Sequence, residues 1–298
     1  MDIITQSSLA AYEKAELPVV EKSNFLYSFS FLPKEEREAI NSLYAFCSYI
    51  DSIVDDTPND LNSKSRKLKR LDWWEKEIEF IYSGVEKAKN LQPFYKLIDR
   101  FVIPKQYFTT LISGCRRDLL QNRYDTFEDL KTYCYSVASV VGLMSIEIFG
   151  YKYEETKSYA INLGYALQLT NILRDIQGDA KRNFIYIPEE DLERFGYSEK
   201  QLLGSEYNAE FAKMMRFQVA RSREYYHKAR SFLRSDERGR LLPAQIMDDI
   251  YYRLLEKIEL NEYNVLNGKI RVSNIHKVMI AMKHWLNIQL FVSTIRKS

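Results

Sequence analysis

The most informative part of the chain is residues 163–179, LGYALQLTNILRDIQGD, within a predicted helix over residues 155–178. The first half of this stretch is apolar, and the second half carries Asn171, Asp175 and Asp179. Residues four apart share one face of a helix, so these three side chains form a column over two turns. Oxygen atoms in register at the edge of an apolar helix indicate a binding site, because unpartnered polar groups are costly there.

A second column of the same kind stands earlier in the chain. Asp51 and Asp55 follow the apolar run LYAFCSYI of residues 43–50. Like charges stacked four residues apart destabilise a helix, and a cation shared between the two columns would offset that cost. Carboxylate and amide oxygens without His or Cys suit a hard cation, and Mg²⁺ is commonly held by one or two carboxylates together with substrate phosphates.

An isolated pair of acids at this spacing is weak evidence, because an ordinary solvated or capping acid explains it more often. Asp56/Asp60 and Asp125/Asp129 share the spacing, and we expect a turn and a helix cap there. The two columns differ from these pairs because each continues a strongly apolar helix.

Helical periodicity runs through most of the chain, and Gly and Pro are scarce. The sequence predicts an all-α protein with a single domain over residues 1–298, of which residues 1–19 form a loosely packed N-terminal arm. Residues 182–188, RNFIYIP, are expected to be extended and to cross the surface. Helices are expected at 35–55, 64–83, 91–102, 127–149, 155–178, 206–234, 241–267 and 273–295, with a further start at Pro188.

Composition argues against several classes of function. The net charge is +2 with acids and bases interleaved, so no nucleic-acid partner is expected. Cys47, Cys115 and Cys134 are widely spaced in apolar surroundings and read as reduced core residues of a cytoplasmic protein. The N-terminus lacks a signal-peptide pattern, and no apolar stretch reaches the ~20 residues of a membrane span. We expect a monomer or weak dimer for which loose contact with a bilayer stays open.

The two columns carry a resemblance to a known family. Residues 44–55, YAFC-x₃-D-x₃-D, resemble the first aspartate-rich motif of squalene and phytoene synthases, and residues 164–179 resemble their second. The second motif is long and specific, whereas a bare D-x₃-D is weak. The similarity covers about residues 20–290 and includes the segments 133–142, 182–188 and 243–251.

This resemblance implies an isoprenoid-synthase-type helical bundle around a deep central cavity, with the two acidic motifs facing each other at its mouth. It also implies a Mg²⁺-dependent (or Mn²⁺-dependent) head-to-head condensation of two identical prenyl diphosphates, through a cyclopropyl intermediate that keeps one diphosphate. Residues 146–150 and the second motif favour farnesyl diphosphate, giving presqualene diphosphate or a squalene-type product, over geranylgeranyl diphosphate, giving phytoene. The chain has no Gly-rich loop that would cradle NADPH, which leaves a reductive second step open. The apolar product is one reason to expect peripheral membrane contact.

The resemblance also implies roles for individual residues. The metal ligands would be Asp51, Asp55, Asn171, Asp175 and Asp179. The four aspartates and Tyr133 would be catalytic, while the substrate would be bound by Tyr44, Gln168, Arg174, Tyr251 and Lys269. On periodicity alone Tyr133 and Tyr251 read as core tyrosines with satisfied hydroxyls, and Arg174 next to Asp175 reads as a plain surface ion pair.

The chain departs from the family pattern in its basic residues. Ser48 stands where relatives usually carry an Arg, and Ser cannot make the two parallel phosphate contacts of a guanidinium. Glu21 lies in a segment where many relatives have His and Ser, and Lys269 stands where Arg is common. These differences leave two alternatives open: a prenyl diphosphate phosphohydrolase on the same scaffold, and a non-catalytic helical protein that binds isoprenoids. The five oxygen ligands in register argue against the second alternative.

Overall fold

The structure is a computed structural model that describes residues 28–55, 61–84 and 91–295, and within these ranges it contains helices and no strand. The long helices are α3 (Lys34–Asp55), α4 (Leu61–Tyr82), α6 (Lys105–Asp118), α9 (Glu155–Lys181), α12 (Ala209–Phe232), α13 (Leu242–Leu260) and α14 (Asn274–Ile295). The shorter ones are α5 (Gln92–Phe101), α7 (Phe127–Cys134), α8 (Val140–Phe149), α10 (Glu189–Arg194) and α11 (Glu199–Leu203).

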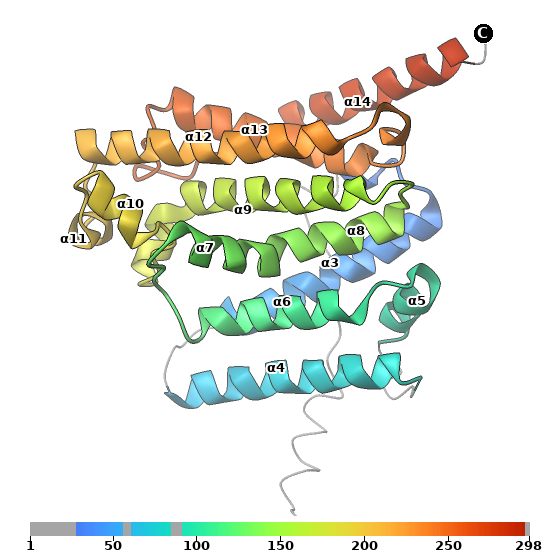
Figure 1. Ribbon diagram of the computed structural model, residues 1–298, viewed down its shortest axis with the longest axis horizontal. Helices are drawn as coiled ribbons and strands as arrows, with labels where there is room; N and C mark the ends of the chain where they lie inside the picture. Colours follow the sequence, from blue (N-terminus) through green and yellow to red (C-terminus); the bar gives the residue numbers. More distant parts are fainter. Residues whose placement is uncertain (1–27, 56–60, 85–90, 296–298) are drawn as a thin grey trace, which may run out of the picture.

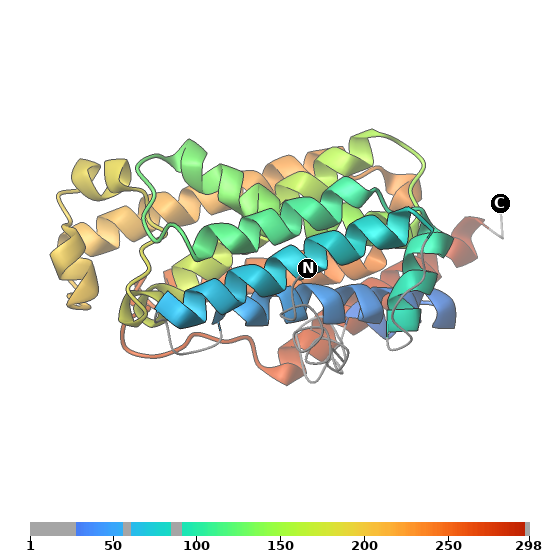
Figure 2. The ribbon, with the colours of Figure 1, turned by 90° about the horizontal axis from the view of Figure 1, so that it is seen from below.

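Most of the long helices run side by side along the longest axis of the molecule (Figure 1). Helix α9 lies in the middle and packs against α8, α12 and α13. Helix α6 lies between α8 and α4, and α3 contacts α4, α5, α6 and α8. The view from below shows α4 in front, with α6 along one side of it and α3 along the other (Figure 2). Because α9 is enclosed by neighbouring helices, its own buried residues lie on several of its faces instead of forming a single apolar stripe.

A cluster of aromatic rings fixes the middle of α3, around Phe46. The Phe46 ring stacks on Phe94 at 4.7 Å between centroids and meets Trp74 and Phe108 edge-on at 5.3 and 5.4 Å. Phe46 and these three partners are fully or almost fully buried and come from α3, α5, α4 and α6, respectively. Offset and edge-on ring pairs stabilise beyond their buried area. The cluster therefore holds the helix on which the first acidic column stands.

Small residues let α9 approach the helical segment that joins α7 to α8. This junction is a single wide π-helical turn, Tyr135–Ser139. A Cβ on Gly164 would lie 2.5 Å from the Ser139 Cα, and one on Gly142 would lie 2.9 Å from the Ala160 carbonyl oxygen. Only glycine permits this distance between the backbones.

Most of the predicted helices are confirmed within a few residues, with three differences. Helix α6 was not predicted, and α13 ends at Leu260 instead of near residue 267. The expectation that the segment 182–188 is extended and crosses the surface is wrong for the segment as a whole, because residues 182 and 183 form a turn and Ile185 and Ile187 are buried in the core. Residues 1–19, Glu21 and the Asp56/Asp60 pair lie outside the described residues.

Among the described residues, one helix is long and apolar enough to cross a membrane, Phe127–Phe149. Half of its apolar window is buried inside the protein. Core helices meet the same criterion, and this one packs between α6 and α9, so its composition is explained by burial in the fold.

Candidate active site

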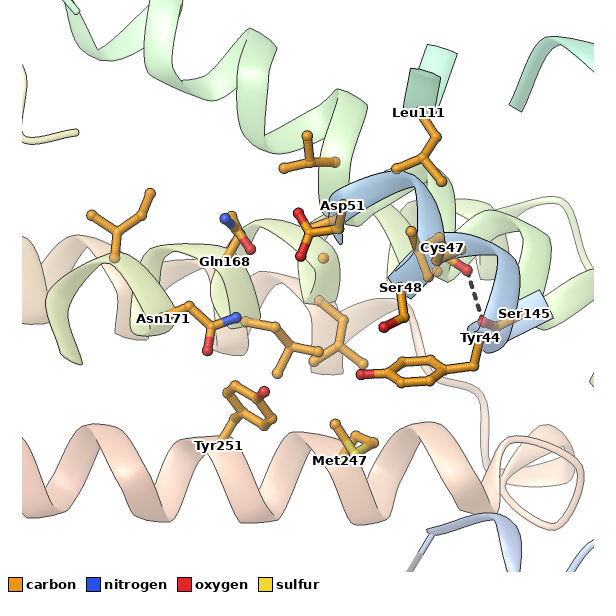
Figure 3. Close-up of a pocket in the computed structure, with 18 of the residues that line it drawn as sticks. Tyr44, Cys47, Ser48, Asp51, Leu111, Ser145, Gln168, Asn171, Met247 and Tyr251 are labelled. Atoms are coloured by element: carbon orange, nitrogen blue, oxygen red, sulfur yellow. Dashed lines mark hydrogen bonds between the residues drawn. The ribbon is translucent and has the colours of Figure 1, made fainter. Parts of the chain in front are cut away.

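A cavity of about 430 Å³ lies between α3, α6, α8, α9 and α13. Ser48 and Asp51 from α3, Asn171 from α9 and Tyr251 from α13 point into the same space (Figure 3). Tyr44 and Asp55 both line the cavity, and at 1.5 Å per residue it extends roughly 16 Å along α3.

All five residues predicted as metal ligands line this cavity. Asp51 and Asp55 come from the last two turns of α3, and Asn171, Asp175 and Asp179 come from the second half of α9. The two columns identified in the sequence therefore meet at one site.

Three basic side chains form ion pairs with these carboxylates. The Arg182 guanidinium joins the two columns, with Nη1 2.6 Å from Asp55 Oδ1 and Nη2 2.9 Å from Asp179 Oδ1. Arg174 donates to both oxygens of Asp175, and Lys269 Nζ lies 3.2 Å from Asp175 Oδ1. The Arg174 side chain is only 17% exposed, so this contact is not the plain surface ion pair that the sequence allowed.

The carboxylates differ in their affinity for a proton. Burial, together with the charge of Asp55, raises the pKa of Asp51 to about 6. The Asp51 side chain is exposed, but towards the cavity, so protein still surrounds it on most sides. Burial also raises the pKa of Asp175, but the Arg174 and Lys269 contacts outweigh it and leave the pKa below its usual value. Burial raises the pKa of Asp179 despite the neighbouring Arg182.

Asn171 tests whether a metal fits this site. Its Oδ1 is buried and accepts no hydrogen bond from any residue in the described ranges. Such an unpartnered oxygen costs roughly 1–3 kcal/mol, which a coordinated cation would recover. The donor set is oxygen only and suits Mg²⁺ or Mn²⁺. No three His, Cys, Asp or Glu side chains in the described part of the chain lie close enough to share one ion. Mg²⁺ is commonly held by one or two carboxylates together with substrate phosphates.

The predicted substrate-binding residues separate into two groups. Tyr44, Gln168, Arg174 and Tyr251 line the cavity, whereas Lys269 reaches the site through its contact with Asp175. This last position follows from the early end of α13, which leaves Lys269 on the loop before α14.

Tyr133 also lines the cavity, and its hydroxyl donates a hydrogen bond to Asp118 Oδ2 at 2.8 Å. Tyr133 and Tyr251 are both buried, as expected of core tyrosines, and both face the cavity. The two interpretations of these tyrosines are therefore compatible.

Sequence reasoning missed four polar residues near the site. Arg182 and Tyr186 lie in a segment quoted for the resemblance but were assigned no role, although both line the cavity. Asp118 ends α6, which was not predicted although its buried residues Phe108, Leu111, Ile112 and Cys115 have helical spacing, and a lone Asp at a helix end gave no sign of a site. Arg70 on α4 lines an open recess that it shares with Ser48, Asp51, Ser52 and Asp55.

Arg70 supplies a basic group close to the position where the family pattern has an Arg. Its Nη2 donates to the Tyr49 hydroxyl at 3.2 Å, and its guanidinium lies over the Tyr49 ring at 5.6 Å from the centroid. Ser48 is exposed and lines both the cavity and this recess. A basic residue near the acidic columns therefore comes from α4, whereas the family pattern places an Arg at position 48 on α3.

Comparison with known proteins identifies the family. The squalene/phytoene synthase family profile matches residues 20–276. Phytoene synthase of Arthrospira platensis is 35% identical over 86% of this chain and 85% of its own length. The 15-cis-phytoene synthase of Synechocystis sp. is 34% identical over 94% of this chain and 86% of its own length.

Solved structures agree with this result. A dehydrosqualene synthase with bound ligand superposes with a TM-score of 0.77 and 25% identity, over 95% of this chain and 97% of that one. The squalene synthase HpnC of Alicyclobacillus acidocaldarius superposes with a TM-score of 0.73 and 26% identity, over 82% and 90% of the two chains. The chain therefore belongs to the squalene/phytoene synthase family and is a prenyltransferase that condenses two prenyl diphosphates head to head.

Proposed function

We propose that this enzyme condenses two molecules of geranylgeranyl diphosphate and forms a phytoene-type product. The observation that carries this proposal is the agreement among the curated relatives. Three cyanobacterial proteins named phytoene synthase or 15-cis-phytoene synthase are 33–35% identical over at least 86% of this chain. They outweigh the features of residues 146–150 and of the second motif that favour farnesyl diphosphate.

Four aspartates and one asparagine would hold the metal ions on which this family depends. These ligands are Asp51, Asp55, Asn171, Asp175 and Asp179, which line one cavity with an oxygen-only donor set. The bound metal would neutralise the diphosphate and so make it a better leaving group. Arg174, Arg182 and Lys269 contact the same carboxylates and would bind diphosphate oxygens through charge-assisted hydrogen bonds.

The remaining lining residues would protect the allylic cation. Tyr44, Tyr133 and Tyr251 present aromatic rings to the cavity, and Gln168 is a polar group among them. Aromatic faces stabilise a cation, and a dry cavity keeps water from capturing it. Exclusion of water separates a coupling enzyme from a phosphohydrolase on the same scaffold. We assign Tyr133 to the reacting carbons because it lines the cavity and stands in a segment, residues 133–142, that resembles the family, and the Asp118 contact at 2.8 Å fixes its hydroxyl there.

Farnesyl diphosphate is the second candidate substrate, because the superposed solved structures are named squalene and dehydrosqualene synthases. Competition decides between the two. The purified enzyme is given equimolar farnesyl and geranylgeranyl diphosphate with Mg²⁺, with and without NADPH, and the products are separated by chain length. We expect a forty-carbon product. Predominance of a thirty-carbon product would overturn the substrate assignment and leave the head-to-head reaction intact.

The proposal also covers where the enzyme acts and how it is assembled. We infer a cytoplasmic protein, monomeric or weakly dimeric, that releases its apolar product by peripheral contact with a membrane. Sedimentation of the purified protein with and without phospholipid vesicles tests this: product release and co-sedimentation should both rise when vesicles are added.

A further inference from the structure

Asp118, Tyr133 and Tyr186 form a hydrogen-bonded cluster on the cavity wall. Tyr133 donates to Asp118 Oδ2 at 2.8 Å, and Tyr186 donates to Asp118 Oδ1 at 3.3 Å. The two phenol oxygens lie 3.5 Å apart, and their rings stack at 5.4 Å between centroids. One carboxylate thus accepts from two tyrosines that come from α7 and from the segment after α9.

The cluster belongs to the cavity and is also protected from bulk water. All three residues line the cavity, and Tyr133 is only 4% exposed. Burial raises the pKa of Asp118 to about 7, although the two tyrosine hydrogen bonds lower it. The other titratable groups within electrostatic reach of the Asp118 carboxylate are Asp51 and Asp55 on α3, together with Cys115, Tyr124 and Cys134. A carboxylate with this affinity can accept and release a proton near neutral pH.

The head-to-head reaction produces a proton that must be removed. The first substrate loses diphosphate by C–O cleavage, and its C1 adds to the C2–C3 double bond of the second substrate, which leaves a positive charge on C3. The cyclopropane closes when the C–H electron pair at the same C1 forms a bond to C3. Two substrates therefore give one cyclopropyl diphosphate, one inorganic diphosphate and one proton.

We propose that Asp118 is the acceptor for this proton and that Tyr133 relays it. The Tyr133 oxygen takes the proton from C1, and its own phenolic proton passes along the 2.8 Å hydrogen bond to Asp118, which becomes a neutral acid. Tyr186 holds the other oxygen of the carboxylate and keeps it aimed at Tyr133. Tyr133 touches the reacting carbons, whereas Asp118 and Tyr186 act through it.

The inference rests on the proposed assignment of Tyr133 to the reacting carbons and is independent of substrate chain length. It predicts a change in product partition. Without the acceptor the first substrate still ionises, because Asp51 and Asp175 are unchanged, but ring closure is slow and water captures the cation. Asp118→Asn keeps the shape of the side chain and cannot take up the proton.

The experiment measures released inorganic diphosphate and, in the same reactions, the ratio of condensed product to prenyl alcohol. For Asp118→Asn we expect this ratio to fall by about 10²–10⁴-fold, the usual contribution of general base catalysis, while diphosphate release persists. Tyr133→Phe should show the same shift, and the double variant should be no worse than either single one, because both changes break one relay.

Tyr124→Phe is the matched control. The Tyr124 ring packs 5.6 Å from Tyr133 and 5.7 Å from Tyr186, but its buried hydroxyl has no hydrogen-bond partner among the described residues. Its product ratio should equal that of the unchanged enzyme. If Asp118→Asn does not fold, Tyr186→Phe removes one of the two donors to the same carboxylate, and the ratio should fall several-fold.

The outcomes separate this proposal from its premise. A wild-type ratio in Asp118→Asn, or a parallel loss of ionisation and coupling at constant ratio, would show that Asp118 is only structural and would overturn the relay. A wild-type ratio in Tyr133→Phe would overturn the assignment of Tyr133 as well. If Asp118→Asn cannot be studied, an unchanged ratio in Tyr186→Phe overturns the relay.

Discussion

Asp51 and Asp175 sit on the two sides of the same site but affect folding with opposite sign. The pKa of Asp51 is raised to about 6, so the folded protein binds its proton more tightly than the unfolded chain. The charged form of Asp51 therefore destabilises the folded protein. This effect is absent at pH values below the ordinary carboxyl pKa, grows as the pH rises, and is complete above about pH 6. The pKa of Asp175 is lowered, so its charge contributes stability that is lost as pH falls.

Replacing each with Asn should therefore separate catalysis from stability. In metal-free buffer at neutral pH, we expect Asp51→Asn to raise the melting temperature, and this gain should vanish in acid. Asp175→Asn should lower it, because Arg174 and Lys269 lose their partner. Both should slow turnover by orders of magnitude. Equal melting temperatures for the two variants at neutral pH, or near-normal turnover in both, would contradict this account of the carboxylates.

Ser48 faces the cavity beside Asp51 (Figure 3). A longer basic side chain at this position would reach the region in which we expect the diphosphate to bind. Ser48→Arg adds a charge-assisted contact to diphosphate worth about 1.5–3 kcal/mol. Ordering the long Arg side chain costs about 1.5–2 kcal/mol of conformational entropy, which offsets most of this gain. We therefore expect the KM for prenyl diphosphate to fall only several-fold, with an unchanged Mg²⁺ requirement. A raised Mg²⁺ requirement instead would mean that the new Arg pairs with Asp51 and competes with the metal.

At the scale of elements, α9 and the π-helical turn approach each other closely where both line the cavity. A Cβ at Gly164 would lie 2.5 Å from backbone of Ser139, so Gly164→Ala must push the two helices apart. Overpacking of this kind typically costs about 1–3 kcal/mol. Gly178→Ala, in the same helix with nothing within 4 Å of the new Cβ, should instead gain up to about 1 kcal/mol from helix propensity. The free energy of unfolding, measured with denaturant, should therefore fall for Gly164→Ala and rise for Gly178→Ala. An unchanged free energy of unfolding in Gly164→Ala would contradict this description of the contact between α9 and the π-helical turn.

The elements also explain what the sequence could and could not predict. Helical period alone places Asn171, Asp175 and Asp179 in one column, so these residues were predictable without a fold. Asp118 was not, because its place in the site depends on α6 packing against α3 and α8. The spacing of Phe108, Leu111, Ile112 and Cys115 predicts the helix, but a single Asp at its end gives no local sign of the site. The burial of Ile185 and Ile187 likewise depends on tertiary packing.

For the whole molecule, the fold was predictable because its signals are spread over the chain and agree with one another. We propose that its metal ions are held by both acidic columns at once. We expect EDTA to abolish activity and excess Mg²⁺ to restore it, because the donor set is oxygen only. Mg²⁺ with inorganic diphosphate should also raise the melting temperature more than either ligand alone, since each completes the other's site. Full turnover in thoroughly chelated buffer would exclude this mechanism.

The central claim is that two prenyl diphosphates are joined to each other in this cavity. The most direct measurement gives the purified enzyme an equal mixture of unlabelled and deuterium-labelled substrate with Mg²⁺ and analyses the products by mass spectrometry. Head-to-head condensation predicts products with no, one or two labelled halves in the binomial proportions of random pairing. Products that contain only a single labelled or unlabelled chain, such as the prenyl alcohol, would contradict the account.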